Sequence, residues 1–284
     1  MKKSTLVHLR FPFSFFLLPV FLFASAIIGS FSLLEFVAVF FILHFLLYPA
    51  SNGYNSFFDK DEGSIGGVRN PPKVTKELYY VAWGLDILAI SLGLCFSWEF
   101  ALMLFIYGMV SKAYSHPITR LKKRPILGWL SAGVFQGYFT FLMVVVAFSG
   151  LDSIWNQEIQ WAALLSTLLL FGSYPMTQVY QHEEDAKRGD ITISLILGVV
   201  GTFHFTAICF TISVALFVWF FCVYFSQGLA VGFVACLAPT LLFFSNWYLN
   251  VLEKLDQANY DNTMKLNIIS STCLNLFFVW MIVS

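Results

Sequence analysis

The stretch FSLLEFVAVFFILHFLLYPASNGYNSFFDKDE, residues 31–62, decides the fold of this chain. It begins with an apolar run of about 20 residues, which is the length at which a helix crosses a bilayer. It ends in three acids, and a second apolar run leads in the same way into the acid-rich segment 181–190. We therefore expect membrane-spanning helices that end in two acidic patches, which contain Asp59, Asp61, Glu62, Glu183, Glu184, Asp185 and Asp190.

The composition supports a membrane protein over its whole length. The chain has 284 residues, of which 58% are hydrophobic, 19% aromatic and only 11% charged, whereas soluble proteins carry about 25% charged residues. We predict an all-α, polytopic membrane helical bundle that forms a single domain over residues 1–284. The formal net charge is zero, so we do not expect nucleic acid as a partner. The five cysteines lie in apolar runs without metal-binding spacing and are expected to be small buried hydrophobes.

The apolar runs predict about nine transmembrane helices. Asp59 and Asp185 lie 126 residues apart (185 − 59), and each closes an even-numbered span. We therefore expect two pseudo-equivalent four-helix halves plus one final helix. Pro12 and Pro19 interrupt the first run, which favours an uncleaved span over a signal peptide. The predicted spans are 12–29, 32–55, 77–96, 98–114, 127–149, 159–180, 191–222, 227–249 and 264–283.

Lysine and arginine predict the orientation of these spans, because cytoplasmic loops are enriched in them. With nine spans, all sixteen Lys and Arg residues fall on the face shared with the N-terminus. Glu99, Asp152 and Glu158 fall on the opposite face. We expect a multi-pass protein of a bacterial cytoplasmic membrane, with its N-terminus and both acidic patches in the cytoplasm.

The acidic patches predict a site for hard cations. If the second span stays helical to residue 62, Asn55, Asp59 and Glu62 share one helix face. Mg²⁺ prefers oxygen ligands and is usually held by one or two carboxylates plus substrate phosphates. The alternative is that acids at a membrane surface face water and balance nearby cations. The candidate ligands are Asn55, Asp59, Asp61, Glu62, Gln181, Glu184 and Asp185.

The loop after the fourth span carries a group of cations that suits an anionic substrate. It reads Tyr114-Ser-His-Pro-Ile-Thr-Arg120-Leu-Lys122-Lys-Arg. Arg120 and Lys122 are candidate ligands for diphosphate oxygens, because arginine binds such groups in bidentate geometry. Tyr114 and Arg69 are further candidates. Ordinary anchoring of a cytoplasmic loop by positive charge is the alternative.

Three polar residues lie inside predicted spans. Asp86 lies in the third span and should face the bundle interior, since an acid in the bilayer costs about 2.5–3.5 kcal/mol. Both a proton-accepting role and a partnered structural role stay open for it. His44 and His204 are expected to be packing residues.

Together, these motifs resemble the UbiA-type intramembrane prenyltransferases. Asn55-Ser-Phe-Phe-Asp59 is similar to the start of their first motif, N-x-x-x-D-x-x-x-D. The segment from Gln181 to Thr192 is similar to their second, and Tyr114 to Arg124 resembles their third loop signature. Two positions depart from the pattern: Gly63 stands where the first motif ends in Asp, and Gln181 stands where the second begins with Asp.

The resemblance implies a helical bundle with a central cavity and Mg²⁺-dependent ionisation of an isoprenyl diphosphate. An aromatic or other lipid acceptor would then attack the allylic cation. By position, Asp59 and Asp185 would be the catalytic residues and, with Asn55, would serve the metal, while Arg120 and Lys122 would serve the diphosphate. The departures in the motifs leave room for a terpene cyclase that needs no acceptor. A transporter or non-catalytic binder is a third hypothesis, although transporters usually place their charges near the midplane.

Overall fold

The computed structural model describes residues 1–284 and consists of helices and connecting loops. Two segments are π-helical, η2 (Ile42–Leu47) and η4 (Phe135–Phe139). Four are short 3₁₀ helices, η1 (Phe11–Phe16), η3 (Leu121–Lys123), η5 (Leu151–Trp155) and η6 (Leu255–Gln257). The α-helices are α1 (Lys3–Leu9), α2 (Leu18–Ile28), α3 (Leu33–Phe41), α4 (Tyr48–Asp59), α5 (Lys76–Gly93), α6 (Trp98–Ser115), α7 (Pro125–Val134), α8 (Thr140–Ser149), α9 (Gln157–Met176), α10 (His182–Arg188), α11 (Ile193–Tyr224), α12 (Gln227–Glu253) and α13 (Tyr260–Val283).

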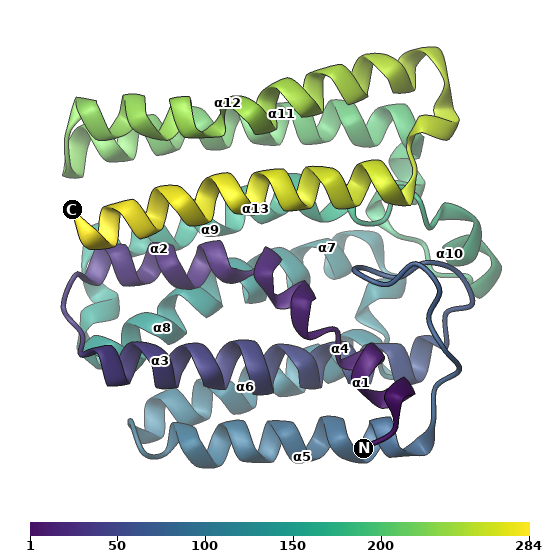
Figure 1. Ribbon diagram of the computed structural model, residues 1–284, viewed down its shortest axis with the longest axis horizontal. Helices are drawn as coiled ribbons and strands as arrows, with labels where there is room; N and C mark the ends of the chain where they lie inside the picture. Colours follow the sequence, from purple (N-terminus) through teal and green to yellow (C-terminus); the bar gives the residue numbers. More distant parts are fainter.

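The long helices run side by side along one axis of the molecule (Figure 1). Helix α2 packs between α13 and α8, and α9 packs along α11. The short helix α10, the α4–α5 connection and the α12–α13 connection gather at the right-hand end of the view, while the C-terminus lies at the opposite end (Figure 1). The two acidic patches therefore lie at the same end of the bundle.

Six helices are long and apolar enough to cross a membrane. They are Leu33–Asp59, Pro125–Ser149, Gln157–Met176, Ile193–Tyr224, Gln227–Glu253 and Tyr260–Val283. The segment Lys3–Phe16 with Leu18–Ile28 makes a seventh if this pair, bent by 45°, is one span. The predicted all-α membrane bundle is confirmed. The count of nine is not, because the predicted third and fourth spans, which form α5 and α6, are absent from this set.

Local sequence explains where α3 begins and why the same membrane span becomes π-helical further along. Ser32 and Glu35 form a capping box at the start of α3, in which each side chain pairs with the other residue's backbone N–H. Within the span Leu33–Asp59, η2 ends two residues before Pro49. Proline lacks an N–H and its ring crowds the carbonyl four residues earlier, so the preceding turn widens into a π-helix while the span continues.

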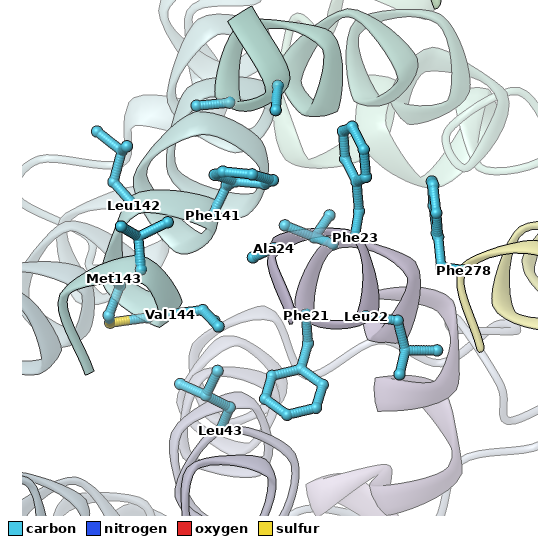
Figure 2. Close-up of a cluster of buried hydrophobic side chains, with 14 of the residues drawn as sticks. Phe21, Leu22, Phe23, Ala24, Leu43, Phe141, Leu142, Met143, Val144 and Phe278 are labelled. Carbon is cyan, nitrogen blue, oxygen red and sulfur yellow. The ribbon is translucent and has the colours of Figure 1, made fainter. Parts of the chain in front are cut away.

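The core is built largely from phenylalanine. Phe21 and Phe23 of α2 are fully buried, and the Phe23 ring stacks on Phe278 of α13 with centroids 4.6 Å apart. Figure 2 shows Phe23 lying between Phe141 of α8 and Phe278. Because aromatic pairs add about 0.5–1.5 kcal/mol beyond their burial, this cluster fixes α2 at the centre of the bundle. His44 is buried against the rings of Phe21, Phe40 and Tyr48, as its packing role requires.

Asp86 of α5 forms an ion pair with Lys112 of α6, and both side chains are buried. The Lys112 ammonium also lies 4.3 Å from the centroid of the Trp83 ring. Of the two roles left open for Asp86, the structure shows the partnered one. His204 is exposed rather than packed inside, and so are Cys95 and Cys222, which corrects the expectation that all cysteines are buried.

Candidate active site

A polar cavity of about 200 Å³ lies between the helices at the end that carries the acidic patches. Asp59 at the end of α4 and Asp185 in α10 both lie on its wall. Tyr114 and Lys122, from α6 and the loop that follows it, lie on the wall as well. The first patch, the second patch and the third loop signature, which are far apart in the sequence, therefore meet in one place.

The first patch is part helix and part loop. Helix α4 ends at Asp59, because Lys60 adopts a left-handed conformation with φ of 50°. The helix therefore does not continue to residue 62, and Glu62 does not share a helix face with Asn55 and Asp59. Glu62 is exposed and is not part of the cavity wall. Asp61 still reaches the wall from the loop, where it forms an ion pair with Arg188.

The second patch is a short helix of its own. Helix α9 ends at Met176, so Gln181 is the N-cap residue of α10, and its backbone carbonyl accepts a hydrogen bond from the Asp185 N–H at 2.9 Å. The Gln181 side chain donates to the Ser64 carbonyl at 2.9 Å, which ties α10 to the loop after α4. Asp185 is 6% exposed, and burial raises its pKa to about 6 although Arg188 and Lys122 lie nearby.

Two cations of the third loop face the carboxylates. Arg120 donates to both oxygens of Asp190, at 2.7 Å and 2.8 Å, and one of its nitrogens lies 3.6 Å from Asp59. The Lys122 ammonium lies 2.5 Å from Asp59 and 3.6 Å from Asp190. Burial alone would raise the pKa of Asp190, but the bonds from Arg120 and the charge of Lys122 hold it below its ordinary value. The loop therefore presents positive charge where α4 and α10 meet.

Arg188 is the cation that links the two patches. Besides pairing with Asp61, it lies 3.6 Å from Asp185 and 3.7 Å from Glu184. Arg188 and Asp190 were not among the sequence candidates, although both lie on the cavity wall. The spacing of Arg188 three residues after Asp185 would have placed both on one face of a predicted α10.

Further polar residues on the wall were also missed. Asn52, one helical turn before Asn55, lies on the wall beside it. The Asn55 amide donates to the Ser115 hydroxyl at 2.7 Å, and the hydroxyl groups of Tyr114 and Tyr174 form a hydrogen bond. Asn52 could have been found from the sequence, because it lies three residues before Asn55 and so shares its helix face. No local sequence pattern indicates that Tyr174 belongs to the site.

Four candidates are not part of the cavity wall: Glu62, Arg120, Arg69 and Glu184. Arg69 forms an exposed ion pair with Asp261 of α13 and is not part of the wall. Glu184 also lies off the wall, and its carboxylate accepts a hydrogen bond from the Gly63 N–H at 2.6 Å. A Cβ atom at position 63 would lie only 2.4 Å from that carboxylate. The Glu184 side chain therefore occupies the space that an aspartate at position 63 would need.

The carboxylates are placed to hold a divalent cation only together with a substrate. No group of three or more His, Cys, Asp or Glu side chains is arranged to bind a metal ion. Mg²⁺ does not need one, because it is usually held by one or two carboxylates plus phosphate oxygens and water. Asp59 and Asp185 supply two carboxylates on one wall, and the Asp59 Oδ1 atom is buried without a hydrogen bond of good geometry. This donor set fits Mg²⁺ that arrives with a phosphate-bearing ligand.

A second cavity of about 140 Å³ adjoins the first. Four residues lie on the walls of both cavities: Phe13, Gln136, Tyr174 and Thr177. Gln136 belongs to η4, which approaches α9 so closely that a Cβ at Gly137 would lie 2.6 Å from the Thr167 Cα. The Phe135 carbonyl accepts hydrogen bonds from both the Thr140 N–H and the Thr140 hydroxyl, the latter at 2.7 Å. These contacts fix Gln136 where the two cavities meet.

Several solved structures that are similar to this chain have the same fold. A UbiA homologue from Archaeoglobus fulgidus bound to DMAPP and Mg²⁺ matches with a TM-score of 0.70 at 16% identity, over 99% of each chain. An apo UbiA homologue from Aeropyrum pernix K1 gives 0.69 at 18% identity, over 93% of this chain and 97% of that one. A digeranylgeranylglyceryl phosphate synthase gives 0.61 at 19% identity, over 99% and 97%.

The fold and the polar cavity define a multi-pass integral membrane protein with a site at one end of its helical bundle. The model of the UbiA prenyltransferase family matches residues 15–269, so the chain belongs to that family. This confirms the resemblance seen in the motifs. A comparison with curated protein sequences finds no significant match.

Proposed function

We propose that this protein transfers an isoprenyl group from its diphosphate to an aromatic or lipid acceptor within the membrane. The observation that carries the proposal is the placement of Asp59 and Asp185 on the wall of one cavity, with Lys122 beside Asp59. The family supports the class of reaction. The homologue from Archaeoglobus fulgidus, which has been solved with GPP and Mg²⁺ as well as with DMAPP and Mg²⁺, supports the class of donor.

The charges on the cavity wall explain why a diphosphate would need Mg²⁺ here. Four carboxylates lie on the wall, Asp59, Asp61, Asp185 and Asp190, and three cations face them, Arg10, Lys122 and Arg188. Arg120, which is paired with Asp190, brings the total close to zero. A diphosphate adds several negative charges, so it needs divalent cations of its own to enter. Asp59 and Asp185 are the residues that would hold them, with Asn55 as a further oxygen donor.

The cations of the third loop would bind the leaving group. Lys122 and Arg120 both lie within 3.6 Å of Asp59. If Asp59 held the metal, N–H groups of these two cations would be free to bind diphosphate oxygens. Bound Mg²⁺ would neutralise the charge that develops as diphosphate departs. The C1–O bond breaks, and its electron pair stays on the diphosphate. The acceptor then forms the new bond to C1 and loses a proton to a diphosphate oxygen or to water.

Aromatic side chains around the polar end would shield the allylic cation. Tyr107, Tyr114 and Tyr174 lie on the cavity wall, and Phe135 lies beside them. Ring faces attract a cation by roughly 0.5–2 kcal/mol when water is excluded.

The experiment compares purified wild-type protein with Asp59→Ala and Asp185→Ala. We expect each variant to lose Mg²⁺-dependent release of diphosphate from an isoprenyl diphosphate while its expression stays near that of the wild type. Turnover retained in both variants would contradict the site. Mass spectrometry of the lipid products separates the reactions: a prenylated acceptor supports transfer, whereas a cyclised hydrocarbon or alcohol formed without acceptor supports a cyclase.

A further inference from the structure

Two acidic positions of the family motifs hold other residues in this chain, Gly63 and Gln181. Glycine has no side chain that could bind a metal ion. The Gln181 amide nitrogen donates to the Ser64 carbonyl at 2.9 Å, and an amide brings no negative charge to offset that of a cation. The polar cavity therefore lacks two of the carboxylates that its motifs would otherwise supply.

Arg188 lies in the region that these two positions border. Its guanidinium pairs with Asp61 of the loop after α4 and lies 3.6 Å from Asp185 and 3.7 Å from Glu184, both of α10. Position 63 is adjacent, because the Gly63 N–H donates to the Glu184 carboxylate at 2.6 Å. A positive charge among three carboxylates offsets the negative potential that would attract a divalent cation to this place.

The position of Arg188 is fixed by its own helix. The spacings of three and four residues place it on the same face of α10 as Asp185 and Glu184. Its Nε–H also donates to the Glu184 carbonyl at 3.3 Å. The side chain lines the polar cavity and is 22% exposed. Because a guanidinium has five N–H donors, Arg188 can pair with these carboxylates and still donate to an oxygen of a bound diphosphate.

The remaining carboxylates of the cavity suffice for one metal ion. Arg120 holds Asp190 by two hydrogen bonds, and Asp61 is engaged in its ion pair. Asp59 and Asp185 are left, and the Asp59 Oδ1 atom is buried without a hydrogen bond of good geometry. Mg²⁺ is usually held by one or two carboxylates together with phosphate oxygens. Two carboxylates therefore account for a single ion.

We propose that the Arg188 guanidinium takes the place of a second divalent cation, so that one Mg²⁺ enters with each isoprenyl diphosphate. Asp59 and Asp185 hold that ion, while Arg188 stays on the cavity wall and donates to diphosphate oxygens. The inference rests on the proposed function, because it concerns the diphosphate of the isoprenyl donor. It narrows the divalent cations of that proposal to one.

The test is equilibrium dialysis of the full chain in a maltoside detergent against Mn²⁺ and geranyl thiodiphosphate, an unreactive analogue of a donor. The excess of manganese and of analogue on the protein side gives the number of ions bound with each analogue. We expect one Mn²⁺ for the wild type. Arg188→Gln should bind two, because three carboxylates lose their cation beside the diphosphate. Arg188→Lys keeps the charge and should bind one.

Lys187→Gln is the matched control, because Lys187 precedes Arg188 but is exposed and does not line the cavity. This variant should bind one Mn²⁺, like the wild type. Two ions in the wild type would overturn the inference, and this count does not depend on how any variant folds. A single ion in Arg188→Gln, or two in Lys187→Gln, would also overturn it.

Failure of the proposed function gives a different result. Wild-type protein would then release no diphosphate from isoprenyl diphosphates, whatever the manganese count shows. An active enzyme that binds two Mn²⁺ with each analogue would instead retain the proposed function and reject the role of Arg188.

Discussion

Arg120 and Asp190 form a bidentate hydrogen-bonded pair at 2.7 Å and 2.8 Å, between the loop after α6 and the end of α10. Asp190 is 1% exposed, and Lys122 lies 3.6 Å from its second oxygen. The pair therefore holds both candidate diphosphate ligands against the second acidic patch. Sequence reasoning included Asp190 in that patch but gave it no role.

Asp190→Asn is expected to destabilise the protein by about 3 kcal/mol, because removing one partner leaves a largely buried guanidinium poorly compensated. It should also raise KM for the isoprenyl diphosphate, since Arg120 and Lys122 lose their fixed positions. Thermal unfolding in detergent and steady-state kinetics measure the two effects. Asp261→Asn removes the exposed pair with Arg69 and should change neither. Equal behaviour of the two variants would show that Asp190 has no positioning role.

Neighbouring lysines provide a matched pair for the diphosphate site. Lys122 is 9% exposed and lines the cavity, whereas Lys123 is exposed and does not. Lys122→Met should raise KM for the isoprenyl diphosphate at least tenfold through the loss of a buried charged contact. Lys123→Met should leave KM unchanged. If the two variants respond alike, the loop acts only through its overall positive charge.

The pair formed by Asp86 and Lys112 is expected to be structural. Replacing only Asp86 by Leu leaves the Lys112 charge buried, which costs about 3–5 kcal/mol. The double variant Asp86→Leu with Lys112→Met removes both charges and should recover most of that stability together with turnover. Thermal unfolding and product formation are the measurements. Recovered stability without recovered turnover would instead assign Asp86 a part in the reaction.

Gly63 and Glu184 are expected to be coupled, because the Glu184 carboxylate occupies the space beside Gly63. Gly63→Ala should destabilise the wild type but be tolerated when Glu184 is also replaced by Ala. A double-mutant cycle on thermal stability measures this coupling. Additive effects would mean that Glu184 moves aside freely. The coupling would explain why a glycine stands where the family motif has an aspartate.

Local periodicity predicted the parts of the site that depend on a single helix. The spacing of Asn55 and Asp59 correctly placed both on the cavity face of α4. The same reasoning failed for Glu62, because one left-handed residue, Lys60, ends the helix before it. No pattern in the sequence predicts that Arg188 reaches Asp61, since 127 residues separate them.

The membrane bundle was predictable because a helix needs about 20 apolar residues to cross a bilayer and such runs recur along the chain. The number of spans was not, because the segments that form α5 and α6 are absent from the set of helices apolar enough to cross. The break in the first span was signalled only by Pro12 and Pro19, whose effect on direction depends on packing. Asn267 illustrates a further limit. In the sequence it is one polar residue in an apolar helix, and only the arrangement of the helices around it creates a cavity that its amide faces.

The Phe13 ring belongs to the walls of both cavities. A substitution at this position therefore changes two compartments at once. A larger or smaller side chain at position 13 would reshape the polar and the apolar cavity together, so neither can be altered alone there. Lys122 lines only the first cavity and Asn267 only the second, so a change confined to one cavity has to be made at residues of that kind.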